Sequence, residues 1–136
     1  MKQFPNFGIV LTVAILVPVM GGGAFAGDEV ARGEQLFKKN CNTCHALPAE
    51  NKNAFGPSLH HVVGRHAGIA SGYSYSSAMH DSRITWTEQE LDGYLKSPKK
   101  FVGPVGYRPN PEIKMTFSGL KDDAERKAVI AYLKVN

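Results

Sequence analysis

The segment that most constrains the fold of this 136-residue chain is the pentapeptide Cys41-Asn42-Thr43-Cys44-His45. Its C-x-x-C-H pattern is the one through which c-type haem is attached covalently to protein. Two cysteines three residues apart lie on one side of a helical turn, so both sulfurs can reach the two vinyl groups of one porphyrin, while His45 projects toward the iron. A domain that contains this motif is expected to close around a single haem.

Other chemistries also use closely spaced cysteines. A thioredoxin-like dithiol is expected after a strand in a βαβ context, and structural zinc takes four ligands. Neither context surrounds Cys41 and Cys44, which are the only two cysteines of the chain. A disulfide framework in a small exported domain usually has four or more. We therefore favour haem over a redox dithiol or a zinc site.

The first 26 residues have the pattern of a signal peptide. Lys2 precedes an apolar run over residues 7–20, and residues 24–26 (Ala-Phe-Ala) fit the small-x-small pattern of a cleavage site. The alternative is an uncleaved membrane anchor, but the run is interrupted by a proline and falls short of the about 20 apolar residues that span a bilayer. We expect residues 1–26 to be removed and residues 27–136 to form one periplasmic domain that is not embedded in the membrane.

The charge of the mature domain is mild. Without Lys2, 15 basic residues face 12 acidic ones, a net charge of +3. Nucleic-acid binding usually needs a concentrated basic face, so we expect no nucleic-acid partner.

Helical patterns dominate the mature domain and predict an all-α fold. An amphipathic pattern covers residues 30–39, and capping boxes at Thr87 and Asp122 each precede an apolar helical face. We expect the helix that begins after Thr87 to end at Ser97-Pro98. No alternating run predicts a strand.

Two long irregular regions separate these helices. Residues 46–83 carry scattered Gly, Pro, Ser and Asn, with a short helix expected near residues 75–80, and residues 99–114 read as a Pro- and Gly-rich loop. Long structureless stretches are unusual in a bare domain. They are expected where the chain wraps something that is not protein.

The sixth iron position decides the class of haem protein. The mature domain has two methionines, Met79 and Met115, and position alone favours Met115 only modestly, since methionine is more often core filler than a ligand. Four histidines besides His45 offer an alternative bis-histidine or distal-base arrangement, although we expect them at the surface: His60, His61, His66 and His80.

Further landmarks make the chain resemble class I cytochrome c, close to bacterial cytochrome c2 and mitochondrial cytochrome c. Gly33 and Phe37 match the family's first helix, and Tyr132 matches their partner in its last helix. The resemblance implies a small fold in which the terminal helices cross and further helices and long loops surround one covalent haem c with its iron.

The resemblance also implies the haem-binding residues. The Gly56-Pro57-Ser58-Leu59 segment matches the family segment whose proline carbonyl orients the proximal histidine, and Lys114-Met115-Thr116-Phe117 matches the segment of the axial methionine. It therefore implies His45 and Met115 as the iron ligands. The remaining implied haem contacts are Pro57, Arg65, Tyr75, Trp86 and Tyr94.

Two departures from the family pattern stand out. Thirteen residues separate Phe101 from Met115, more than in short-loop members. Ile113 stands where the family often has threonine, and Met79 where it commonly has asparagine. Both side chains make the pocket less polar, and we expect this to raise the reduction potential.

The resemblance implies a soluble, monomeric single-electron carrier and not an enzyme. Expected partners are acidic redox proteins such as a cytochrome bc1 complex, a terminal oxidase, a photosynthetic reaction centre or a soluble reductase. Lysines expected to steer such partners are Lys38, Lys39, Lys99, Lys100, Lys114 and Lys121. The alternative is a haem enzyme or gas sensor with an open or weakly held sixth position.

Overall fold

The structure, a computed structural model, describes residues 23–47, 55–105 and 112–136. Most of the predicted signal peptide lies outside these residues. The described part is helical, and its only strand-like pairing is an isolated bridge between His66 and Thr85. The all-α prediction is confirmed. The helices are α1 Gly23–Asn40, α2 Ser77–His80, α3 Glu88–Lys96, α4 Pro98–Val105 and α5 Asp123–Lys134.

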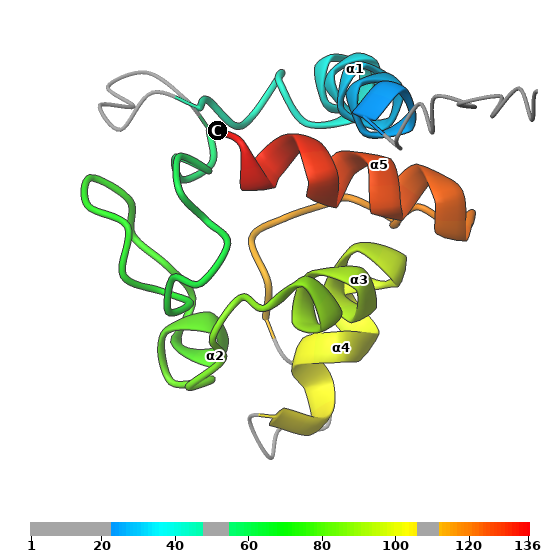
Figure 1. The fold of residues 1–136 in the computed structure, drawn as a ribbon. Helices are drawn as coiled ribbons and strands as arrows, with labels where there is room; N and C mark the ends of the chain where they lie inside the picture. Colours follow the sequence, from blue (N-terminus) through cyan, green and yellow to red (C-terminus); the bar gives the residue numbers. More distant parts are fainter. Residues whose placement is uncertain (1–22, 48–54, 106–111) are drawn as a thin grey trace, which may run out of the picture.

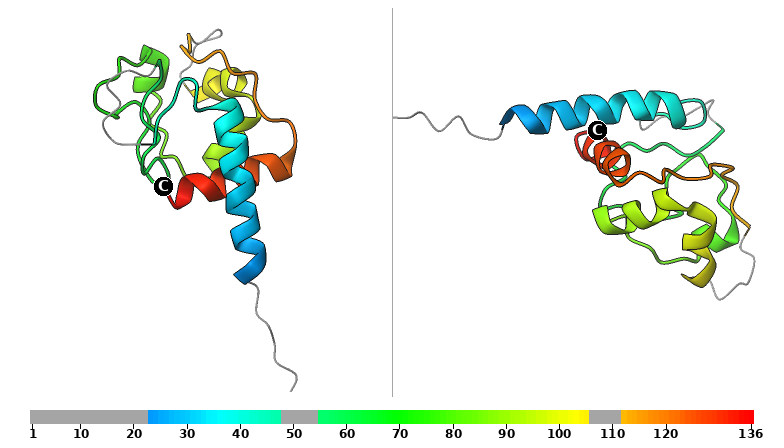
Figure 2. Two further views of the ribbon diagram at one scale, coloured as in Figure 1. Left: turned by 90° about the horizontal axis from the view of Figure 1, so that it is seen from above. Right: turned by 90° about the vertical axis from the view of Figure 1, so that its right-hand side faces the viewer.

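The two terminal helices, α1 and α5, lie across each other on one side of the molecule (Figures 1 and 2). Gly33 permits this close crossing, because a Cβ there would lie 1.9 Å from the carbonyl oxygen of Ala128. Phe37 packs beside the gap against Tyr132, with ring centroids 5.5 Å apart. The predicted crossing of the terminal helices is confirmed.

Two of the helices begin at the predicted caps. The Thr87 hydroxyl accepts a hydrogen bond from the Glu90 amide at 3.2 Å, and the Asp122 carboxylate accepts one from the Glu125 amide at 2.8 Å. Each side chain satisfies an amide that has no partner inside its helix. Local capping chemistry therefore sets where α3 and α5 start.

The region after Pro98 differs from the prediction of a continuous loop over residues 99–114. Pro98 ends α3 as expected, but it is also the first residue of α4. Proline suits a first helical position because the amide it lacks would have no partner there. Phe101 is half-buried and Val102 fully buried, so α4 also has an apolar side that stabilises it. Residues 106–111 of the predicted loop lie outside the described residues.

The irregular region predicted between α1 and α3 is present and contains only the short α2 among its described residues. It runs on one side of the molecule, while α3 and α4 lie on the other and α5 lies above the space between them (Figure 1). Gly64, Gly68 and Gly72 have positive φ angles and allow its tight turns. Among the described residues, no helix is long and apolar enough to cross a membrane.

Candidate functional site

A cavity of about 460 Å³ opens among these elements. The cavity is lined by the cysteine motif at the end of α1 and by Met79 and Met115, which come from distant parts of the chain. All nine residues predicted from the sequence to bind the cofactor line it: Cys41, Cys44, His45, Pro57, Arg65, Tyr75, Trp86, Tyr94 and Met115.

The two cysteines lie in a turn that continues α1. The amides of Cys44 and His45 both donate to the Cys41 carbonyl, at 3.0 and 2.9 Å. Cys41 is half-buried, and this burial, together with the neighbouring Cys44, raises the pKa of its thiol to about 11. Cys44 is exposed. The motif thus presents one inner and one outer sulfur at the cavity wall.

His45 is oriented by its neighbours. Its Nδ1 lies 2.8 Å from the Pro57 carbonyl oxygen, and because a carbonyl only accepts, Nδ1 carries the proton. A Cβ on Gly56 would lie 2.7 Å from the imidazole ring, so a larger residue at this position would displace the ring. Burial lowers the pKa of His45, opposed by the hydrogen bond to Pro57. The ring is therefore held neutral, with the Nε2 lone pair available to a metal.

Met115 is contacted by a phenol. The Tyr94 hydroxyl donates to Sδ of Met115 at 3.9 Å, and burial raises the pKa of Tyr94. Trp86 and Phe101 pack on the Tyr94 ring, with centroids 4.8 and 5.9 Å away. Met79 is 92 % buried and lines the same cavity, as its place in the family pattern implied.

Arg65 is fixed by backbone carbonyls. It donates from Nη1 to the carbonyl of His60 and from Nη2 to that of Ser58, both at 2.7 Å. Burial lowers its pKa. A guanidinium has five donors, so further N–H groups remain for an acidic group at the cavity edge. None of the four other histidines, all of which belong to the described part, lines the cavity.

The donors and the lining together fit a covalently attached haem. The two thiols can form thioether bonds to vinyl groups, and a neutral imidazole and a methionine thioether are both suitable iron ligands. Apolar side chains that can pack against a macrocycle include Leu59, Leu91 and Leu133. Arg65 and Tyr75, which also line the cavity, carry N–H and O–H donors of the kind that buried propionates need.

The six lysines predicted for docking divide into two sets. Lys38 pairs with Glu34 at 2.6 Å, the Lys114 ammonium donates to the Ser74 carbonyl at 2.6 Å, and Lys121 donates to two further carbonyls. The other three are exposed and have no such partner among the described residues: Lys39, Lys99 and Lys100.

Comparison with known proteins identifies the class of protein to which this chain belongs. The family model described as Cytochrome c matches residues 30–135. The chain is 37 % identical over 128 residues to cytochrome c2 of Blastochloris viridis, covering 94 % of this chain and 89 % of that protein. It is 40 % identical over 102 residues to cytochrome c of Kluyveromyces lactis, covering 75 % and 86 %.

Solved structures agree with these relatives. The fold is similar to cytochrome c2 of Rhodospirillum centenum, with a TM-score of 0.70 and 37 % identity over 77 % of this chain and 95 % of that one. It is also similar to cytochrome cH of Methylobacterium extorquens, with a TM-score of 0.67 and 38 % identity, covering 79 % and 98 %.

A helical fold around a C-x-x-C-H motif, matched by the family model over most of its length, defines a class I c-type cytochrome. The chain belongs to the cytochrome c family. It carries one haem c, with its iron, attached covalently through Cys41 and Cys44, and it is an electron carrier.

Proposed function

We propose that this protein is a soluble periplasmic carrier of single electrons whose haem iron is held by His45 and Met115, and that it is not an enzyme. The bound haem supplies a ferric/ferrous couple that accepts and returns one electron. The observation that carries the proposal is the hydroxyl of Tyr94, which is directed at the sulfur of Met115 inside the cavity.

The chain's own residues suit this role because they hold the site in place and give it a mainly apolar lining. Pro57 fixes the His45 ring, Tyr94 contacts the Met115 sulfur, and apolar residues make up most of the lining. A site that is fixed in this way needs little rearrangement when its charge changes.

Export and partner choice belong to the same proposal. The predicted cleavage after Ala26 falls within the first turn of α1, and cytochromes c2 are among the relatives. We expect acidic partners of the kinds named above, namely a cytochrome bc1 complex, a terminal oxidase, a photosynthetic reaction centre or a soluble reductase. The intact mass of the exported protein tests the processing, because cleavage after Ala26 leaves Gly27 as the first residue.

Absorption spectra of the purified holoprotein test the ligation. A sulfur ligand on ferric iron gives a weak near-infrared band, which we expect in the parent and in Met79→Leu but not in Met115→Ala. Loss of the band in Met79→Leu instead would move the sixth ligand to Met79. A parent without the band, whose ferrous form takes up carbon monoxide readily, would replace the carrier by a haem enzyme or gas sensor.

A further inference from the structure

The residues that follow Met115 leave the cavity and turn back toward α5. We call residues 118–121 the anchor segment, since they are fastened to the C-terminal end of α3. The Leu120 amide donates to the Leu95 carbonyl at 2.8 Å. This bond joins the chain just after Met115 to the helix that carries Tyr94.

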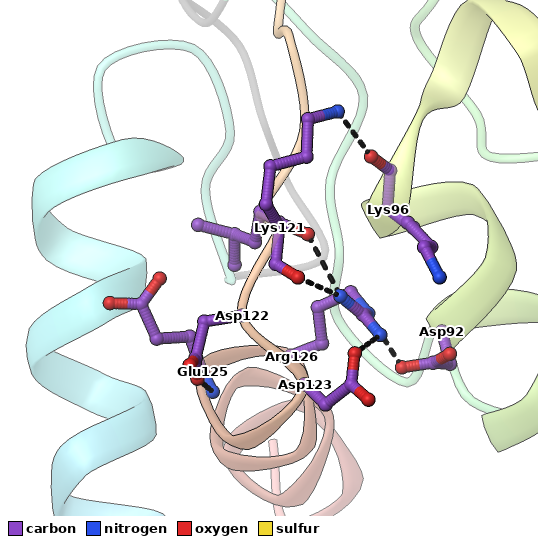
Figure 3. Close-up of polar contacts among 8 residues, drawn as sticks. Asp92, Lys96, Lys121, Asp122, Asp123, Glu125 and Arg126 are labelled. Carbon is purple, nitrogen blue, oxygen red and sulfur yellow. Dashed lines mark hydrogen bonds and ion pairs between the residues drawn. The ribbon is translucent and has the colours of Figure 1, made fainter.

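Two neighbours of Leu120 tighten this attachment. Gly119 has a φ of +96°, and a Cβ there would lie 2.3 Å from the Lys96 carbonyl oxygen, so backbone lies directly on backbone. The Lys121 ammonium donates to the same Lys96 carbonyl at 2.8 Å (Figure 3). The last carbonyls of a helix have no partner within it, and the anchor segment supplies donors to two of them here.

Arg126 of α5 holds the other side of the anchor segment (Figure 3). Its Nη1 donates to the carbonyls of Leu120 and Lys121, each at 3.0 Å, and its Nε donates to the Asp92 carboxylate of α3 at 2.7 Å. Its Nη2 contacts the Asp123 carboxylate. One guanidinium thus joins α3, α5 and the anchor segment.

This arginine is 98 % buried, and every one of its nitrogens has an acceptor. A buried charge is costly unless it is paired and fully hydrogen-bonded, so the site is satisfied only while the anchor segment stays in place. Release of the segment would leave two donors without partners. The guanidinium therefore opposes movement of the chain next to Met115.

We propose that Arg126 is a positioning residue for the sixth iron ligand, acting through the anchor segment and touching neither haem nor Met115. This proposal rests on the proposed ligation by Met115. An external ligand can bind the iron only when Met115 withdraws, so its affinity measures how readily that segment of the chain opens. A residue that only joined α3 to α5 would change global stability without changing this affinity selectively.

The experiment titrates the ferric holoprotein with imidazole as the probe and monitors binding by the loss of the near-infrared sulfur band. Urea unfolding of the same samples measures global stability. Arg126→Lys keeps the charge but lacks the planar fork that reaches carboxylate and carbonyls together. We expect it to bind imidazole about tenfold more tightly or better, the effect of losing one charged hydrogen bond. Asp92→Asn weakens the hold on the guanidinium without removing it and should give a smaller change in the same direction.

Two controls separate positioning from stability. Glu88→Gln breaks the other ion pair between α3 and α5, Glu88 with Lys134 at 2.7 Å, and leaves the anchor segment alone. We expect less than about a twofold change in imidazole affinity, because exposed ion pairs contribute little. Phe37→Leu lowers global stability at the contact of α1 with α5 and should leave the affinity close to that of the parent.

The outcomes are distinct. A parent without the sulfur band would overturn the proposed function itself. A parent with the band, together with parental imidazole affinity in Arg126→Lys and Asp92→Asn, would overturn the positioning role alone. So would an affinity gain in Phe37→Leu equal to that of the arginine variant at equal loss of unfolding stability.

Discussion

The hydroxyl of Tyr94 donates to the sulfur of Met115 at 3.9 Å, across 21 residues of sequence. In the proposed ligation by Met115, a hydrogen-bond donor on the sulfur withdraws electron density from it. The sulfur is then a weaker electron donor to the iron, which stabilises the ferrous form relative to the ferric form. Burial raises the pKa of Tyr94, so the phenol remains a donor over the physiological pH range.

Tyr94→Phe should therefore lower the reduction potential. A net hydrogen bond contributes about 1 kcal/mol, which for one electron is on the order of 40 mV. Potentiometric titration measures the change, and Phe101→Leu, which alters the ring packed on Tyr94 but not the donor, is the control. An equal potential in the parent and Tyr94→Phe would show that the contact does not tune the iron.

Met79 gives a second test of how polarity sets the potential. It is buried in the cavity wall, where an apolar side chain favours the less charged reduced haem. We expect Met79→Asn to lower the potential and Met79→Leu, which conserves volume without adding a polar group, to leave it nearly unchanged. A potential in Met79→Asn as high as that of the parent would remove this explanation.

Gly33 tests the crossing of the terminal helices. In Gly33→Ala the new methyl group would meet the Ala128 carbonyl oxygen at 1.9 Å and Cβ of Tyr132 at 2.8 Å. Neither backbone can yield without separating α1 from α5, so we expect a loss of about 3 kcal/mol or more in the free energy of unfolding. Urea unfolding measures it, with the neighbouring Glu34→Ala expected to cost about 0.5 kcal/mol. Equal losses in both variants would contradict the close approach.

The features that the sequence predicted are local or carried by a motif. Thr87 and Asp122 cap their helices because a capping box depends on residues three apart. The start of α4 at Pro98 was missed because the same proline that ends one helix can begin the next.

Contacts between distant residues had no comparable signal. Arg126 and Asp92 are 34 residues apart, and Lys114 reaches the Ser74 carbonyl across 40. Nothing in the spacing of these residues indicates that the fold brings them together. Spacing alone did not place Met79 in the cavity wall either, and only the resemblance to the family implied that position.

Asp123 makes the stability of the fold depend on pH in the acid range. The hydrogen bond to Arg126 and its charge, aided by Lys96 and Lys127, lower the carboxyl pKa below its usual 3.8. A group whose pKa is lower in the folded state stabilises the fold above its unfolded pKa, and this contribution is lost as the pH falls through the folded pKa.

The advantage of the parent over Asp123→Asn in urea unfolding should therefore be constant near neutral pH. It should shrink once the pH falls below about 4. An advantage that persists undiminished into strong acid would show that the contact acts through packing and not through charge.

The division of the lysines predicts which of them meet a partner. Lys38 is already paired with the Glu34 carboxylate, and Lys114 must give up its bond to Ser74 before it can pair elsewhere. Lysines without such contacts have no bond to give up. Removal of their charge should therefore slow encounter with an anionic oxidant more than removal of the charge of the engaged lysines. The free set is Lys39, Lys99 and Lys100, and the engaged set is Lys38, Lys114 and Lys121.

Stopped-flow oxidation of the reduced protein by ferricyanide at low salt measures the effect. Triple Lys→Gln substitution of each set removes the same formal charge, so a rate that depended on net charge alone would fall equally in both. We expect the free-set variant to be slower by about threefold or more and to lose most of its salt dependence, since steering is screened within a Debye length. A cationic oxidant should reverse the direction of the change. Equal slowing by both sets would mean that the intramolecular contacts of the engaged lysines have no influence on encounter.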